Sequence, residues 1–238
     1  MGISITPNGL DTAAAALRYW ERRQEISSNN LANVETSGFR AERAFSHLLA
    51  DGVTPEIGTM TDRRTGAITR TDNPLDVALP GDGFFVVRGA NDEEKLTRAG
   101  AWRLDAERRI VDPSGRPVLG EGGELTLPPG ASAIEISRTG EVMADGQQVG
   151  RLRIEQIATT TPLQHEGDGV FTMPDEHEAM PDEQRVVQQG AIEGSNVTSV
   201  TALVDMIAVQ RAYAAVQKTM TTIDQVRGIA ATDLAKPV

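Results

Sequence analysis

Two apolar seams, one at each end of the chain, constrain the fold more than any other feature. In the first, side chains recur at alternating steps of three and four residues, which places them on one face of a helix. This heptad spacing is narrow and suits a single partner helix. The sequence predicts a helix that Asn8 caps, ending where Asn33 and Gly38 mark a turn. The seam comprises Leu10, Ala13, Leu17, Trp20, Gln24, Ser27, Leu31 and Val34.

The C-terminal segment repeats this design. Ser195 or Asn196 offers a cap, and Gly228 weakens the far end. We predict a second helix from about residue 198 to about residue 227. Its seam, again at steps of three and four with one residue just ahead, comprises Leu203, Met206, Val209, Tyr213, Val216, Met220 and Ile223.

The middle of the chain has a different texture, because short apolar and β-branched stretches alternate with polar residues and glycine turns. The pair Asp145-Gly146 is the strongest hairpin signal. We expect Phe84, Phe85 and Trp102 in the core of an all-β domain. The predicted fold class is therefore α+β. Its parts are the N-terminal helix and turn (1–46), an extended connector (47–71), the all-β domain (72–190), in which 172–183 is a surface loop, and the C-terminal helix (191–238).

The negative charge of the chain, −11 in total, lies in the middle. Residues 47–199 carry 26 acidic and 14 basic residues, whereas the two ends together carry 8 and 9. The acidic middle repels nucleic acid and anionic lipid, so we expect no nucleic-acid partner. No apolar run is long enough to span a bilayer, so we expect no membrane insertion. The start of the chain lacks the basic and apolar regions of a cleaved signal peptide.

The two seams leave two arrangements open. They can meet within one molecule as a helical hairpin, which is an ordinary bundle attached to a β-domain. They can also meet the ends of other molecules, and contacts of this heterologous kind generate filaments when they do not close. A third possibility is a β-sandwich binding module with helical arms, which would need an exposed aromatic patch.

The sequence gives little support for a catalytic or metal-binding site. Cysteine is absent, which excludes disulfides and thiolate sites. The histidines are His47, His165 and His177, and the last stands in the run Asp175-Glu176-His177-Glu178 without a second spaced histidine, so a solvated acidic loop is the better interpretation. The run Gly120-Glu121-Gly122-Gly123 is acidic and lacks the lysine of a phosphate-binding loop. We predict no catalytic, cofactor or metal site.

Several stretches resemble the flagellar rod and hook proteins. The first is Ser28-Asn29-Asn30-Leu31-Ala32-Asn33-Val34-Glu35-Thr36-Ser37-Gly38-Phe39-Arg40, which is similar to their N-terminal signature. Further matches follow in the family's order: Asn73 to Leu79 with Gly81 to Phe85, Thr97 to Trp102, Glu193 to Val197, and Met206 to Tyr213. Within the family, the run Gln210 to Tyr213 looks most like the distal-rod protein, whereas the total length is closer to the proximal-rod paralogue, and both remain open.

The resemblance implies a structural rod subunit of the flagellar basal body in the periplasm, exported through the flagellar type III apparatus without cleavage. It also implies that the terminal helices form a coiled-coil-like assembly core, and that the partners are copies of the chain and other rod and hook subunits. Asn29, Asn30 and Asn33 can bond backbone groups where the helix breaks, Gly38 permits a turn, and Phe39 would pin the turn against a neighbour. The expected assembly interface comprises these five residues with Leu10, Leu17, Trp20, Leu31, Leu203, Met206, Val209, Tyr213, Val216, Met220 and Ile223.

Overall fold

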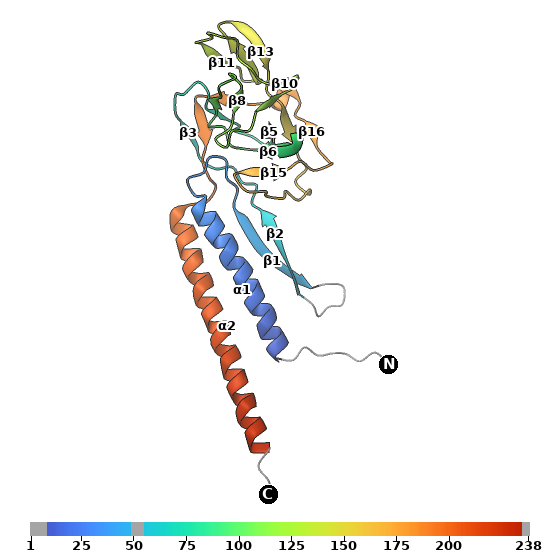
Figure 1. Cartoon of the computed structure of the whole chain (residues 1–238), viewed down its shortest axis with the longest axis vertical. Coiled ribbons are helices and arrows are strands. Elements are labelled where there is room, and N and C mark those ends of the chain that lie inside the picture. Colours follow the sequence, from blue (N-terminus) through green and yellow to red (C-terminus); the bar gives the residue numbers. More distant parts are fainter. Residues whose placement is uncertain (1–8, 49–54, 235–238) are drawn as a thin grey trace. The chain divides into compact units, whose positions relative to one another are not determined.

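The computed structural model describes residues 9–48 and 55–234, which form two compact units (Figure 1). Unit 1 combines both ends of the described chain: residues up to Ala32, Glu42–Met60, and the residues from Ser199 onward. Unit 2 contains Asn33–Ala41 and Thr61–Thr198. The turn that follows the N-terminal helix therefore belongs to the β-rich unit.

Unit 1 is a pair of antiparallel helices with a two-stranded ribbon. The helices are α1 (Gly9–Ala32) and α2 (Ser199–Leu234), and the ribbon pairs β1 (Glu42–Leu48) with β2 (Pro55–Thr61), whose last residue lies in unit 2. The two helices lie side by side, and α1 also contacts β1 (Figure 1). The seams thus meet within one molecule, as one of the two arrangements left open by the sequence requires.

The buried side of each helix follows its seam, with two exceptions: Ile26 on α1, which is buried outside the seam, and Leu203 on α2. Ala13 and Ser27 on α1 and Val209 on α2 are buried. Leu203, which we expected in the seam, is 50% exposed, and Ala202 is 5% exposed in its place. Two successive steps of three residues, from Val209 to Met206 to Leu203, rotate a position about 120° off the face, whereas a step of four after a step of three keeps Ala202 on it.

Unit 2 is an assembly of short antiparallel strands around two clusters of buried apolar side chains. A five-stranded sheet has the order β15-β6-β5-β14-β16, and a three-stranded sheet has the order β11-β12-β13. Two-stranded pairs complete it: β3 with β18, β4 with β17, β7 with β8, and β9 with β10. The strands are β3 (Ile68–Arg70), β4 (Val77–Ala78), β5 (Phe84–Arg88), β6 (Glu94–Thr97), β7 (Arg103–Leu104), β8 (Ile110–Val111), β9 (Leu119–Gly120), β10 (Gly123–Glu124), β11 (Ile134–Ile136), β12 (Glu141–Ala144), β13 (Gln147–Arg151), β14 (Ile154–Gln156), β15 (Val170–Thr172), β16 (Glu178–Ala179), β17 (Gln188–Gln189) and β18 (Ala191–Glu193).

The predicted core aromatics are buried. The rings of Phe85 and Trp102 meet edge to face with their centroids 4.8 Å apart, and Phe84 meets Phe171 in the same way at 5.8 Å. The segment predicted as an extended connector, 47–71, holds the end of β1 and all of β2 and β3 in its described part, and the predicted surface loop 172–183 holds β16. The C-terminal helix continues past Gly228 to Leu234.

The predicted hairpin at Asp145-Gly146 is confirmed. These two residues connect β12 to β13, and both have positive φ angles, 48° and 79°. Two consecutive left-handed residues form the type I′ turn that matches the twist of the flanking strands. Asp145 also accepts the backbone N–H of Ala133 at 2.9 Å, and hydrogen bonds from the N–H groups of Ala133 and Ser132 hold the pKa of its carboxyl below its usual value.

We predict that Gly146→Ala destabilises unit 2 by about 1 kcal/mol, because a Cβ is unfavourable in the left-handed conformation. No atom lies within 4 Å of that Cβ, so sterics with neighbours do not contribute. The matched control is Gly122→Ala in the turn between β9 and β10, which is equally open but lacks a positive φ. Urea unfolding should show a loss only at 146, and equal losses at both positions would contradict the conformational cause.

Candidate functional site

The turn after α1 is built into unit 2 by its backbone. The N–H of Gly38 donates to the carbonyl of Glu193 at 2.8 Å, and φ at Gly38 is +69°. A Cβ at this position would lie 2.2 Å from the carbonyl carbon of Arg98. Only glycine therefore fits here, for both its conformation and its close approach to a second strand. Gly38 is an internal packing position.

Phe39 is wholly buried in its own chain. Its ring meets His165 edge to face at 5.4 Å, and His165 meets Phe171 at 4.8 Å. Arg98 lies over the ring of Phe84 at 5.3 Å, which extends the cluster by a cation–π contact. The expectation that Phe39 pins the turn against a neighbouring subunit is not what the structure shows, because its side chain leaves no surface for a neighbour.

A buried ion cluster lies beside Phe39. Glu193, with no exposed surface, accepts from Arg40 at 2.6 Å through Oε1 and from Arg98 at 3.3 Å through Oε2. The backbone N–H of Gly66 also donates to Oε1 at 2.9 Å. Arg98 donates to the carbonyls of Leu79, at 2.8 Å, and of Gly81, and Arg40 donates to the carbonyl of Arg64. We call Gly38, Phe39, Arg40, Arg98 and Glu193 the signature clamp.

Burial dominates the electrostatics of the signature clamp. Desolvation lowers the pKa of Arg98 to about 10, although Glu193 and Asp82 oppose this shift, and Arg40 adds to it by like-charge repulsion. Desolvation also lowers the pKa of Arg40, against the attraction of Glu193. Both guanidinium groups remain charged at neutral pH. One carboxylate thus holds two buried cations, which are costly to leave unpaired.

Two asparagine side chains, one before the first clamp residue in the sequence and one after the last, hydrogen-bond to backbone groups. Within unit 1, the Asn30 side chain accepts the N–H of Glu42 at 3.0 Å and donates to its carbonyl at 2.8 Å. Within unit 2, Asn196 accepts the N–H of Ala41 at 2.7 Å and donates to the carbonyls of Asp62 and Arg64, both at 2.9 Å. Each side-chain amide thereby supplies hydrogen bonds to backbone groups that a neighbouring strand would otherwise supply. Asn30 thus bonds backbone groups as expected, its place in an assembly interface stays a prediction, and Asn196 is an addition.

The remaining expected interface residues lie on the helices or at their ends. Val209 is 2% exposed, so its own chain covers it. Asn29 is exposed, and Asn33 accepts the hydroxyl of Thr36 at 3.2 Å. The side chain of Leu10 lies outside the described residues. The half-buried members of the set are Leu17, Trp20, Leu31, Met206, Tyr213, Val216, Met220 and Ile223.

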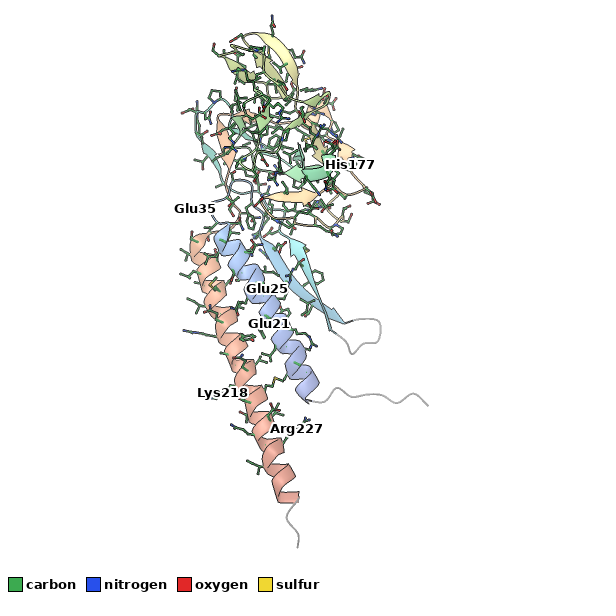
Figure 2. All side chains as sticks on the ribbon, viewed as in Figure 1. Glu21, Glu25, Glu35, His177, Lys218 and Arg227 are labelled. Carbon is green, nitrogen blue, oxygen red and sulfur yellow. The ribbon has the colours of Figure 1, made fainter. Side chains whose placement is uncertain are left out.

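The acidic run around His177 is exposed and leads into the edge strand β16. His177 Nδ1 lies 2.8 Å from the carbonyl oxygen of Pro174, and the side chain is exposed (Figure 2). A shallow depression beside it is lined by Gln156, Ala158, Glu176, His177 and Glu178. Among residues 9–48 and 55–234, no three histidine or carboxylate side chains lie close enough together to hold a metal ion.

Comparison with known proteins places these features in one class. Residues 10–40 match the family described as flagella basal body rod protein, and residues 78–144 match the D1 domain of flagellar hook proteins FlgE/F/G. Residues 188–233 match the C-terminal region of flagellar basal body rod FlgEFG proteins. The three matches cover α1 with its turn, the first half of the β unit, and α2.

Individual relatives extend over nearly the whole chain. The flagellar basal-body rod protein FlgF of Salmonella typhimurium is 33% identical over 91% of this chain and 94% of its own, and FlgF of Escherichia coli is 32% identical over the same shares. FlgG of Agrobacterium fabrum is 31% identical over 94% of this chain and 98% of its own. The chain belongs to the family of flagellar basal-body rod proteins. It is a structural subunit of the flagellar basal body and has no enzymatic role.

The sequence reasoning missed Arg40, Arg98, Glu193 and Asn196 as site residues. All four stand in the stretches that resemble the family, so the signal was present. What was missing was their mutual placement, because Arg40 and Glu193 occupy opposite ends of the sequence and no periodicity joins them. A charged residue within two positions of a glycine, as for Arg40, Arg98 and Glu193, was the available clue.

We predict that Glu193→Gln lowers the free energy of unfolding of unit 2 by about 3 kcal/mol or more, because two buried arginines lose their counter-charge. The matched control is Asp72→Asn, which removes an ion pair with Arg70 of the same 2.6 Å length whose side chains are 75% and 80% exposed. Solvent screens that pair, so the urea midpoint should hardly change. Comparable losses in the two variants would contradict a special role for the buried cluster.

Proposed function

We propose that this chain polymerises through its α1–α2 hairpin into the tubular rod and that the tube transmits torque. The observation that carries the proposal is the surface of unit 1. After α1 and α2 have packed together, large apolar side chains of α2 remain exposed, including Val200, Val204 and Ile229 at 60–75%. An exposed apolar surface of this kind, on a helix with few charges, indicates a site of contact with another protein.

The charge distribution supports the same function. The two ends of the chain carry nearly equal numbers of acidic and basic residues, whereas residues 47–199 carry the excess acid. Hairpins from different copies therefore approach each other without a large repulsive cost, and acidic β units repel each other. This arrangement favours association through the helices alone.

The signature clamp supports torque transmission. Gly38 and Arg40 follow the end of α1 by about six and eight residues, and Glu193 precedes the start of α2 by about six, so one buried cluster fixes the chain soon after the first helix and shortly before the second. A load on either helix then reaches a folded β unit through hydrogen bonds and an ion pair. A loose linker at either point would absorb the twist.

We further propose the route and the neighbours. The chain passes through the flagellar type III export apparatus unprocessed, resides in the periplasmic rod, and contacts other rod and hook subunits along the axis. Support comes from the family matches at both ends of the chain. The intact mass of the chain recovered from purified basal bodies tests whether residues are removed.

Concentration of the purified full chain tests polymerisation. We expect open helical polymers by electron microscopy and a rising sedimentation coefficient as concentration increases. A protein that stays monomeric, or stops at a closed dimer, at every concentration would contradict the proposal.

We predict that Val209→Asp abolishes polymerisation and leaves unit 2 folded. The side chain is 2% exposed, so the new carboxylate would be buried without a partner, which separates the helices. The adjacent exposed residue gives the control, Gln210→Asp, which should keep the helical hairpin. Helical circular dichroism reports the hairpin, and Trp102 fluorescence in a Trp20→Phe background reports unit 2. Normal polymers from Val209→Asp would show that the hairpin is not the assembly module.

A further inference from the structure

Helix α2 has a second apolar face, opposite its seam. Val200, Leu203, Val204 and Ile207 are 75%, 50%, 60% and 43% exposed. At about 100° per residue, these four positions fall on the side of α2 that faces away from the buried Val209. We call them the N-terminal patch of α2. Among the described residues of α1, none of the large apolar side chains is exposed to this degree.

A smaller apolar patch lies near the other end of the same helix. Val226 and Ile229 are 60% and 62% exposed, and we call them the C-terminal patch. Helix α2 has 36 residues and α1 has 24, so α2 is longer by about 18 Å. In Figure 1 the far end of α2 extends past the start of α1. The C-terminal patch lies on this extension.

We propose that the C-terminal patch of one subunit covers the N-terminal patch of the next copy of this chain. The inference rests on the proposed polymerisation and names the surface that carries it. The centres of the two patches are about 24 residues apart along α2, which corresponds to a shift of about 36 Å between successive copies. A contact between different patches is heterologous, so it continues into an open polymer and does not close into a dimer.

The charges between the patches favour this staggered contact. Arg211 and Lys218 are exposed on the same side of α2 as the patches, with Ala214 and Ala215 between them (Figure 2 labels Lys218). If two α2 helices paired along their whole length through this side, in either a parallel or an antiparallel orientation, the basic groups of both copies would meet in an interface that excludes water. Overlap of the ends alone joins apolar surface to apolar surface and leaves the basic residues in water.

A bilayer is the other occupant that the composition of α2 allows. The segment Ser199–Ile229 contains an 18-residue window with a mean hydropathy of 1.2, of which 11% is buried, so the segment meets the length and composition of a membrane-crossing helix. Arg211, Lys218 and Asp224 lie within it at exposed positions. Charges at these positions would have to enter the hydrocarbon layer, which is costly, whereas the staggered protein contact leaves the two basic residues hydrated.

The absence of cysteine makes disulfide cross-linking a direct test. One full-length variant carries Val204→Cys and a second carries Ile229→Cys, and the two are mixed, assembled and oxidised. We expect a 204–229 disulfide between copies, and ladders of linked chains from the double variant. The control variant replaces Gln210→Cys, an exposed position about 120° from Val204 around the helix, and should not cross-link to position 229.

A charge substitution measures the contribution of the patch. Val204→Asp should raise the concentration for half-maximal polymerisation at least about tenfold, with the α1–α2 hairpin intact by circular dichroism, because the residue is exposed in the single chain. If the cysteine variants polymerise but give no 204–229 disulfide, or give only 204–204 links, the inference is overturned and the proposed function stands.

Two further outcomes separate the alternatives. If the unmodified chain forms no polymer at any concentration, both the proposed function and this inference fail. If it floats with phosphatidylcholine vesicles and Val204→Asp does not, α2 is a membrane segment and the inference is overturned. Absence of flotation together with the 204–229 disulfide supports the staggered contact.

Discussion

The signature clamp depends on one carboxylate. Glu193 has no contact with solvent and bonds to Arg40, Arg98 and the backbone of Gly66, which come from three separate parts of the sequence. An ion cluster of this kind is costly to desolvate, so it forms only when every partner is in place. The turn after α1 and the strand before α2 therefore fold together with the β unit. The chain segments that lead out of α1 and into α2 therefore belong to one cooperative structure.

The sequence pattern predicted the features that depend on local interactions, namely the buried sides of the helices and the geometry of a turn. Steps of three and four residues identified the buried sides of α1 and α2, since a helix repeats about every 3.6 residues. The pair Asp145-Gly146 identified its turn because a type I′ turn needs two consecutive left-handed residues, which an Asp-Gly pair adopts readily. Leu203 was misplaced because it was chosen for its apolarity, whereas the small Ala202 keeps the step of four.

The sequence did not show which surface each predicted residue meets. A seam specifies that a helix has a partner, and the same seam suits a helix in the same chain or in another. Phe39 was interpreted as an anchor against a neighbour, whereas its ring is buried and meets His165, which is far away in the sequence. Hydrogen bonds such as that from Ala41 to Asn196 cross 155 positions, and no local pattern encodes them.

The two sides of α2 have different roles, and this difference follows from the length and the charge of the helix. The seam side is satisfied by α1, and this contact makes each hairpin a stable unit before it meets another copy. The opposite side keeps its apolar residues at the two ends and its basic residues between them, so the ends are the parts that gain from contact. A helix that matched α1 in length would have no free end to offer. The extra turns of α2, which have no counterpart in α1, therefore suit the helix to a polymer better than to a closed bundle.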